Sequence, residues 1–357
     1  MSHAPARSRL RPALALLLSG GAALWFAWDV DWAPLWTTLK AVRLSWIGAA
    51  AAIVLFEFVL RALRWHVLLR PLGAPHPKVS DLFVAQIVGA SANTLFPLRA
   101  GEIARPVVAA RRCGKPLSAV VATAVMERVY DLFGLLCVLL LMTATLGDAM
   151  STAGPEEQVL IRNLTRYGSM FGLFAMGCMA VFFVLATREH AARETFGRIL
   201  LLGPPPVRRL FMGLFDGFVA GLGNARDLRG LVQAGLLSIW MWVDGAIAIW
   251  CLFQAFSMPL PFGAACFTAV AIALTVALPQ APGFLGVFHV AMEKTMLLWG
   301  QAESQAEGFA IVFWAVSFLP VTMLGLSALW REGLAIDDLK DVKVLGQRTP
   351  DASDTTT

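Results

Sequence analysis

A helix-breaking motif inside an apolar stretch is the most informative chemical feature of this chain. Residues 93–105 read NTLFPLRAGEIAR. Pro97 cannot donate a backbone hydrogen bond and biases the residue before it away from the helical region. Gly101 permits backbone shapes that other residues resist, and a helical pattern resumes at about Ala100. The motif therefore predicts a new helix N-terminus, with unpaired N–H groups and partial positive charge, at membrane depth.

Charged side chains surround this break. Arg99 and Arg105 add full positive charges to the helix end, and Asn93 and Glu102 add polar groups. Together they favour a site for an anionic group such as a phosphate, with Glu102 orienting the arginines. The alternative is a purely structural break stabilised by an Arg–Glu pair. If the site binds an anion, charge reversal at Arg105 is expected to abolish function and leave the protein folded.

The next apolar stretch carries Glu127, Arg128 and Asp131. Glu127 and Asp131 are four residues apart and share a helix face, with Arg128 beside them. Two acids near one base predict a buried network that takes Arg99 or Arg105 as a partner. A substrate site and a structural network are both compatible with this pattern.

Three more charged residues fall on one helical face earlier in the chain, at Glu57, Arg61 and Arg64. One interpretation is an internal Glu57–Arg61 pair with Arg64 extended toward the headgroups. The other is an anion-attracting cavity wall to which Arg61 contributes. Asp244 stands in the middle of a later apolar run without a local partner, and is interpreted as a proton or cation relay or as the partner of a distant arginine.

A second break lies at Pro279, Pro282, Gly283 and Gly286, followed by a lone histidine, His289. It repeats the order apolar run, proline, glycine and renewed helix. Broken backbone at membrane depth is tolerated where it lines a protein-enclosed or watery cavity. Two broken segments are typical of transporters built from inverted repeats. His289 is interpreted as a structural hydrogen-bonding residue.

The composition indicates the environment of these motifs. The chain has 357 residues, of which 58% are hydrophobic and 15% charged, and its net charge is +5. A soluble domain has about 25% charged residues, so a water-soluble globule, a disordered chain and a disulfide-stapled module are excluded. The long apolar runs also exclude a membrane barrel. The fold class predicted is an all-α, polytopic helical membrane protein.

Apolar runs of about 20 residues predict six membrane crossings and two re-entrant helical hairpins, near 79–112 from the cytoplasm and near 263–300 from outside. The basic residues then gather on the cytoplasmic side with both termini, as the positive-inside rule requires. The domains expected are an N-terminal segment over 1–11, a transmembrane domain over 12–331 and a cytoplasmic tail over 332–357, disordered near its end. The crossings expected lie near residues 13–28, 45–69, 118–146, 167–186, 230–256 and 308–330.

At its two breaks the chain resembles the transmembrane region of lysylphosphatidylglycerol synthases, a flippase-like family, and the resemblance covers about residues 10–332. Three departures from the family pattern occur: Phe284 replaces a glycine, His289 an acidic residue and Trp314 an arginine. The matching positions are Asn93, Pro97, Arg99, Gly101, Glu102, Arg105, Glu127, Arg128 and Asp131 at the first break, and Pro279, Pro282, Gly283 and Gly286 at the second.

The resemblance implies a lipid-handling protein of a bacterial cytoplasmic membrane that lacks the soluble synthase domain. The leading hypothesis is a translocase that moves a lipid with an anionic or polar headgroup between leaflets, such as a phospholipid, an aminoacyl-phospholipid or a polyprenyl- or hopanoid-type lipid. No cofactor, metal, nucleic acid or catalytic residue is expected, and a homo-oligomer is compatible with the sequence. The alternatives are a non-transporting partner of a separate lipid-modifying enzyme and an intramembrane aminoacyl or glycosyl transferase.

Overall fold

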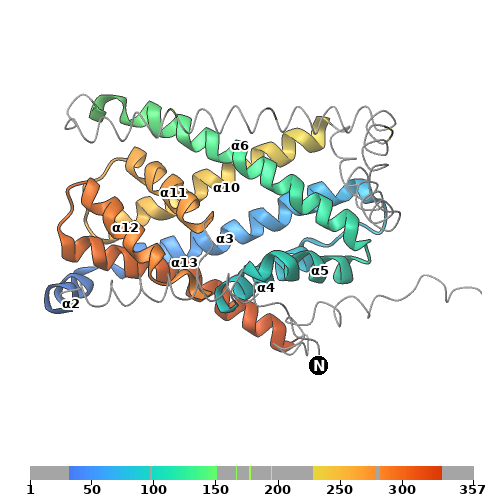
Figure 1. Ribbon diagram of the computed structural model, residues 1–357, viewed down its shortest axis with the longest axis horizontal. Coiled ribbons are helices and arrows are strands. Elements are labelled where there is room, and N and C mark those ends of the chain that lie inside the picture. Colours follow the sequence, from blue (N-terminus) through green and yellow to red (C-terminus); the bar gives the residue numbers. More distant parts are fainter. Residues whose placement is uncertain are drawn as a thin grey trace, which may run out of the picture.

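A computed structural model describes residues 32–96, 99–150, 228–277 and 282–331, together with residues 166, 177 and 194. Pro97 and Pro279, the expected crossings near 13–28 and 167–186, and both terminal segments lie outside these residues. All the regular elements in the described part of the chain are helical, which confirms the predicted fold class (Figure 1). In chain order they are α2 (Trp32–Ala41), α3 (Leu44–Leu69), η1 (Arg70–Leu72), α4 (Val79–Leu95), α5 (Gly101–Cys113), α6 (Leu117–Met150), α10 (Leu228–Ala255), α11 (Phe262–Ala277), η4 (Pro282–Phe284), α12 (Val287–Leu298) and α13 (Glu303–Arg331).

Three helices in the described residues are long and apolar enough to cross a membrane. They correspond to α3 extended through η1, to α10 and to α13, and they match three of the expected crossings. α11 is apolar but shorter. The third expected crossing, near 118–146, lies within α6, a single helix of 34 residues that contains Glu127, Arg128 and Asp131. The number of crossings and the membrane side of each hairpin stay predictions.

Both predicted breaks interrupt the helices. α4 ends at Leu95 because Phe96 takes an extended conformation, with φ −115° and ψ 146°, as a residue before a proline does. α5 then begins at Gly101. The second break separates α11 from α12 and contains the short η4, followed by Gly286 with φ 82°. Each break therefore leaves a gap of several residues between two helices that would otherwise be continuous.

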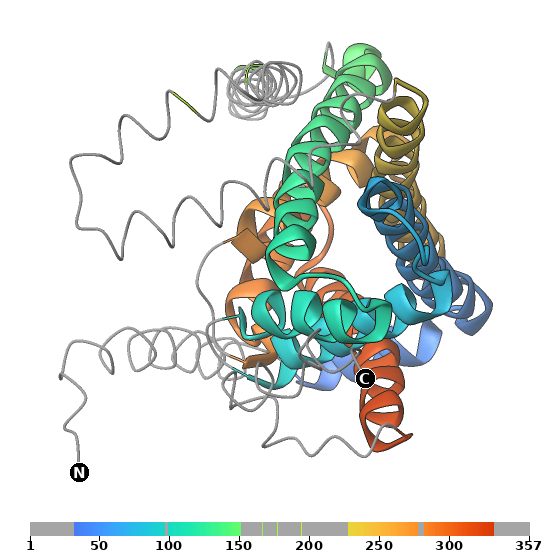
Figure 2. The same ribbon diagram turned by 90° about the vertical axis from the view of Figure 1, so that its right-hand side faces the viewer.

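In Figure 2 the green α6 lies on one side, the yellow α10 and blue α3 lie together on the other, and the teal α4 and α5 lie below them; α4 packs on α3 and α5 on α6. α3 and α10 run antiparallel. The start of α3 lies beside the end of α10, where the Arg43 backbone N–H donates to the Ala255 carbonyl at 3.0 Å. Small residues allow close packing. A β-carbon at Gly134 of α6 would lie 2.1 Å from Cδ1 of Trp242 on α10.

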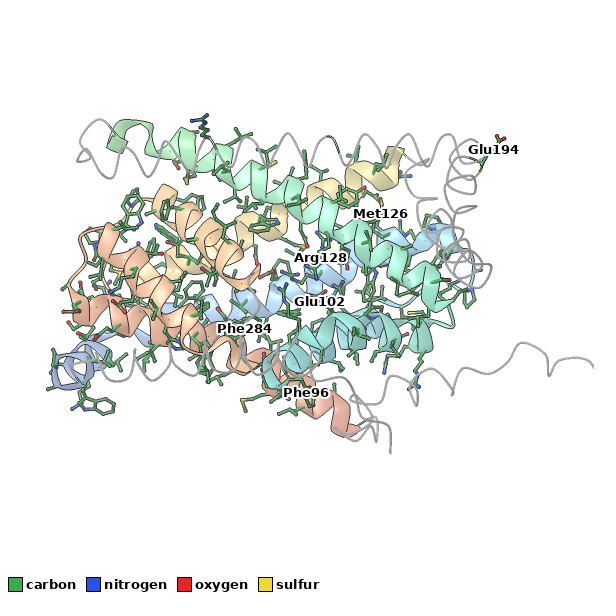
Figure 3. The ribbon with its side chains drawn as sticks, in the orientation of Figure 1. Phe96, Glu102, Met126, Arg128, Glu194 and Phe284 are labelled. Atoms are coloured by element: carbon green, nitrogen blue, oxygen red, sulfur yellow. The ribbon has the colours of Figure 1, made fainter. Side chains whose placement is uncertain are left out.

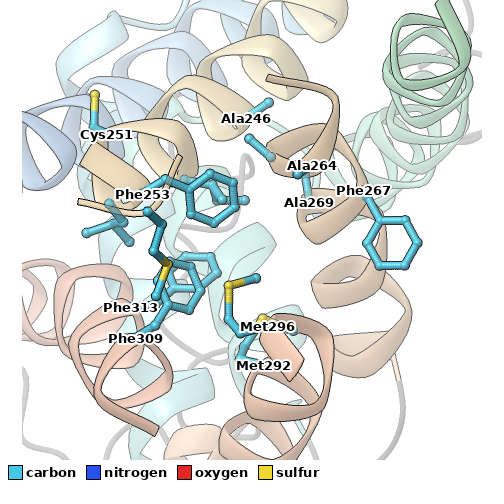
Figure 4. Packing of buried hydrophobic residues seen from close by; sticks show 14 of the residues in the cluster. Ala246, Cys251, Phe253, Ala264, Phe267, Ala269, Met292, Met296, Phe309 and Phe313 are labelled. Carbon is cyan, nitrogen blue, oxygen red and sulfur yellow. The ribbon is translucent and has the colours of Figure 1, made fainter. Parts of the chain in front are cut away.

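The larger apolar core lies among α10, α11, α12 and α13 (Figure 4). Phe253, Phe309 and Phe313 gather at its centre with Met292 and Met296 beside them. Their rings make tilted contacts with centroids about 5.5 Å apart, a favourable aromatic geometry. Phe284 of the second break is part of this core.

Candidate functional site

The first break is held in place by an unusually close approach of α4 and α5. A β-carbon at Gly101 would lie 1.8 Å from the Gly89 carbonyl oxygen and 2.6 Å from Oδ1 of Asn93. Only glycine, which has no β-carbon, lets α5 approach α4 this closely. The close approach therefore requires glycine at position 101, in addition to the backbone freedom expected from the sequence. Arg99, inside the break, has a positive φ of 55°. The fold therefore turns sharply here and brings Asn93 and Arg99 to the start of α5.

Glu127 on α6 lies at the centre of an ionic network. Its Oε2 is 2.9 Å from Nη2 of Arg105 on α5, and its Oε1 accepts a 3.5 Å hydrogen bond from Nη2 of Arg64 on α3. Arg105 also donates to Oε1 of Gln86 on α4 at 3.1 Å, and its guanidinium lies over the Trp65 ring. The predicted partnership between Arg105 and the acids of α6 is confirmed.

Asp131 extends the network by one helical turn along α6. It accepts a 2.6 Å hydrogen bond from Nη1 of Arg64, which also donates to Oγ of Ser238 on α10 at 2.8 Å. Arg128 pairs with Glu102 on α5 and approaches Asp131 at 3.4 Å. Figure 3 shows Arg128 and Glu102 side by side near the middle of the molecule. The network thereby joins five helices: α3, α4, α5, α6 and α10.

The structure decides between the interpretations of Arg64 and adds a partner for Glu102. Of the two interpretations of this helix face, extension of Arg64 toward the headgroups is wrong, because its side chain is only 1% exposed and pairs with Glu127 and Asp131. Glu102 pairs with Arg128, a partner that the sequence did not indicate, and it also interacts electrostatically with Arg105 and Arg99. The sequence signal for Arg64 was present, since it shares a helix face with Arg61. The partners Gln86 and Ser238 carry no signal that separates them from other polar residues in apolar runs.

Several buried polar atoms beside the first break have no hydrogen-bond partner in the described residues. At the break itself they are Oδ1 of Asn93 and Nε of Arg99, while Nε2 of Gln86 and Nε of Arg105 lie further along the α4–α5 pair. Buried polar groups are normally satisfied, so a cluster of unsatisfied ones indicates a place for water or a polar ligand. This cluster includes one acceptor and three donors, and the donors belong mostly to cations.

The arginine side chains of the site differ in how far they are exposed. The side chain of Arg128 is 49% exposed and that of Arg61 is 31% exposed, and Arg61 pairs with Glu57. Arg105 is 10% exposed. Arg61 and Arg128, together with Arg99, which is partly exposed, are therefore the cations that an incoming group can reach, while Arg64 and Arg105 mainly connect helices. Charge reversal at Arg105 would place a second carboxylate against Glu127, so this variant is not expected to stay folded.

The second break lies against the first. A β-carbon at Gly283 would lie 3.8 Å from the Thr94 carbonyl oxygen, and η4 packs on α4. Nε1 of Trp314 donates to the Gly283 carbonyl at 2.6 Å, so the residue in place of the family arginine satisfies the broken backbone. Phe284 has a positive φ of 57° and stacks on Phe318.

His289 follows the second break and is buried. Its ring packs beside Trp314 with centroids 5.8 Å apart, and beside Phe288. The predicted site residues therefore separate into two groups. The first break carries the charges, and the second break contributes backbone, aromatic rings and one histidine.

Asp244 lies apart from the ionic network. It is 6% exposed, and its Oδ2 has no hydrogen-bond partner in the structure. Among the residues that the structure describes, no arginine pairs with it, so the expectation of a distant arginine partner finds no support there. No group of three or more His, Cys, Asp or Glu side chains in the same residues is placed to bind a metal ion.

Interrupted helices and a buried ionic network inside an apolar bundle define a helical membrane protein with a polar site between its helices. The comparison with known proteins identifies the family. Residues 13–325 match the model of the lysylphosphatidylglycerol synthase transmembrane region, and the chain belongs to this family. The resemblance seen at the two breaks is thus confirmed over most of the chain.

Three curated relatives are similar over long stretches. A UPF0104 membrane protein of Methanothermobacter thermautotrophicus is 24% identical over 80% of this chain and 84% of its own length. A UPF0104 membrane protein of Methanocaldococcus jannaschii is 23% identical over 65% of this chain and 90% of its own length. Glycosyltransferase AglD of Haloferax volcanii is 26% identical over 70% of this chain but only 43% of its own length. No solved structure matches the chain.

Proposed function

We propose that the protein is a lipid translocase that moves a lipid with an anionic headgroup between the leaflets of a bacterial cytoplasmic membrane, with both termini in the cytoplasm. The headgroup enters beside the first break, and the acyl chains stay in the bilayer. The observation that carries the proposal is the group of unsatisfied polar atoms at Asn93 and Arg99, next to the accessible Arg128.

The charge balance of the site supports an anionic ligand. The six charged groups of the network cancel, because the cations Arg64, Arg105 and Arg128 face the anions Glu102, Glu127 and Asp131. Arg61 and Glu57 also cancel. Arg99 adds one further positive charge at the break, and its Nε is buried without a partner. A guanidinium of this kind is well suited to a phosphate, which it binds through several N–H groups at once.

The contact between the two breaks supports movement of the ligand past the site. The hairpins α4–α5 and α11–α12 are proposed to enter from opposite sides of the membrane, with their interrupted ends together at Thr94 and Gly283. A headgroup bound there would lie near the middle of the bilayer. Rocking of the two halves of the bundle around this point would open the site to each side in turn.

The experiment is lipid transfer in proteoliposomes that contain the full chain and fluorescent phosphatidylglycerol or phosphatidylcholine. Transfer is followed by bleaching of the outer leaflet with an impermeant reductant. We expect faster transfer of phosphatidylglycerol than in empty vesicles. Transfer equal to empty vesicles for phosphatidylglycerol, cardiolipin and a polyprenyl phosphate would contradict the proposal.

A second candidate is a membrane partner of a separate lipid-modifying enzyme. One relative is named a glycosyltransferase, and this chain matches less than half of its length. Co-purification of such an enzyme, with no transfer by the isolated protein, would favour this candidate. Chemically altered lipid after incubation with the isolated protein would instead indicate a transferase.

A further inference from the structure

Asp244 is a buried carboxyl group at the middle of a helix that is long enough to cross the membrane. α10 supplies one of the three candidate spans, Arg229–Ala255, and Asp244 lies close to its midpoint. The side chain is more than nine-tenths buried, and its Oδ2 has no partner in the described part of the chain. Ionisable residues in such a position are rare and usually face a partner or a pathway.

The register of α3 against α10 places a second acid opposite Asp244. At the start of α3, the backbone of Arg43 is hydrogen-bonded to Ala255 at the end of α10. Near the end of α3, the side chain of Arg64 is hydrogen-bonded to Ser238 of α10. Between these points Glu57 comes level with Asp244, and the two carboxyl groups interact electrostatically. Glu57 is already paired with Arg61, so the arginine does not serve Asp244.

In the part of the chain that the structure describes, the other helices packed on α10 offer no cation at this level. Glu127, Arg128 and Asp131 of α6 are engaged in the network around Arg64, and α11 contributes one thiol. The charged and titratable residues on helices in contact with α10 are Glu57, Arg61, Arg64 and His66 on α3; Glu127, Arg128, Tyr130, Asp131, Cys137 and Asp148 on α6; Cys266 on α11; and Glu303, Glu307 and Arg331 on α13.

A carboxylate buried without a cation is costly, whereas a neutral carboxylic acid in the same place is not. A metal cation would need several oxygen ligands, and the described residues contain no cluster of acids that could supply them. A proton needs only the one unsatisfied oxygen. We propose that Asp244, facing Glu57 across the α3–α10 interface, is a proton-binding site that couples lipid movement to a pH gradient.

The proposed step is a reversible protonation. Water on the side of low pH supplies a proton to Oδ2 of Asp244, which changes from carboxylate to acid, and the same proton leaves to water on the other side. Protonation removes the repulsion between Asp244 and Glu57 and lets α3 and α10 approach. This inference rests on the proposed function for its coupling part, while the proton site itself can be tested independently.

The coupling experiment measures the leaflet distribution of labelled phosphatidylglycerol in proteoliposomes with a gradient of one pH unit. One proton per lipid supports a steady-state leaflet ratio of up to about tenfold. We expect such a ratio for the unmodified protein, its collapse on addition of a protonophore, and a ratio near one for Asp244→Asn. Glu303→Gln, which removes an exposed acid on α13, is the matched control and should keep the gradient response.

The outcomes separate the two proposals. Phosphatidylglycerol transfer without any response to the pH gradient, or a response to a sodium gradient instead, would overturn the coupling and leave the translocase function standing. An Asp244→Asn variant that keeps the response would also overturn it. No transfer by the unmodified protein would contradict the translocase function itself.

An infrared measurement tests the proton site without transport. The carboxylic acid C=O band of the purified protein at neutral pH should contain a component that disappears in Asp244→Asn and persists in Glu303→Gln. The Tm of Asp244→Asn should stay within a few degrees of the unmodified protein, because asparagine is isosteric with the neutral acid. An unchanged band, or a large loss of Tm, would overturn the assignment.

Discussion

Nη2 of Arg105 lies 2.9 Å from Oε2 of Glu127, so the helix that follows the first break is tied to the middle of α6. The pair is almost completely buried, and Arg105 also contacts Gln86 and the Trp65 ring. A buried pair contributes little net free energy, but loss of one partner leaves the other as an uncompensated charge. The pair therefore fixes the position of the break more than it adds stability.

Removal of Arg64 should be strongly destabilising. Arg64→Met leaves Glu127 and Asp131 without their shared cation, and we expect a loss of about 3–5 kcal/mol in unfolding free energy. Arg61→Met makes the same chemical change on the same helix at a pair whose side chains are 31% and 20% exposed, where about 1 kcal/mol or less is expected. Thermal unfolding in detergent measures both. Equal losses in the two variants would show that the buried network has no special role.

The sequence predicted this network in part. The spacing of Glu127 and Asp131 indicated a shared face, and a partner arginine from the first break was expected and is found in Arg105. The central role of Arg64 was not expected, because a basic residue near a helix end is equally compatible with extension to the headgroups. Only the packing of α3 against α6 and α10 decides between these positions, and that packing involves contacts between residues far apart in the sequence.

Gly101 should not tolerate even a methyl group. In Gly101→Ala the new β-carbon meets the Gly89 carbonyl oxygen, so α4 and α5 must separate. Overpacking of this kind costs about 1–3 kcal/mol, and the shift should also lower lipid transfer. Gly48→Ala, in a helix position with open space, should gain up to about 1 kcal/mol. Unfolding and transfer of both variants would be compared, and a Gly101→Ala protein with normal values would refute the close approach.

The indole of Trp314 should stabilise the second break through its hydrogen bond to Gly283. Trp314→Phe keeps an aromatic ring beside His289 but loses the donor, with an expected cost of about 0.5–1.5 kcal/mol. Trp240→Phe, at a more exposed position on α10, is the control and should change stability little. A loss confined to Trp314→Phe supports the role of the donor, and equal effects would exclude it.

At the second break, the family pattern alone does not show how the chain accommodates Phe284 and Trp314. The sequence predicted the interruption near Pro282, and its departures at Phe284 and Trp314 marked where this chain differs. The structure gives both departures a physical role. Phe284 takes a left-handed conformation that glycine adopts more easily, and its ring stacks on Phe318. Such compensation depends on a neighbour on α13, which a local motif does not include.

Arg99 should be required for transfer rather than for folding. Arg99→Gln removes a cation of the first break that makes no ion pair with the residues that the structure describes, so little stability should be lost. A charge-assisted hydrogen bond contributes about 1.5–3 kcal/mol, so transfer of phosphatidylglycerol should fall about tenfold to a hundredfold. Arg43→Gln, an exposed arginine before α3, is the matched control and should transfer normally.

Arg99→Lys adds a third comparison, because lysine keeps the charge and loses the planar set of donors. Partial recovery of phosphatidylglycerol transfer in Arg99→Lys would indicate that charge at this position attracts the headgroup. Normal transfer by Arg99→Gln, with unfolding unchanged, would move the headgroup site away from the first break. The accessible Arg128 and Arg61 would then be the cations to test, since Arg64 and Arg105 are committed to the buried network.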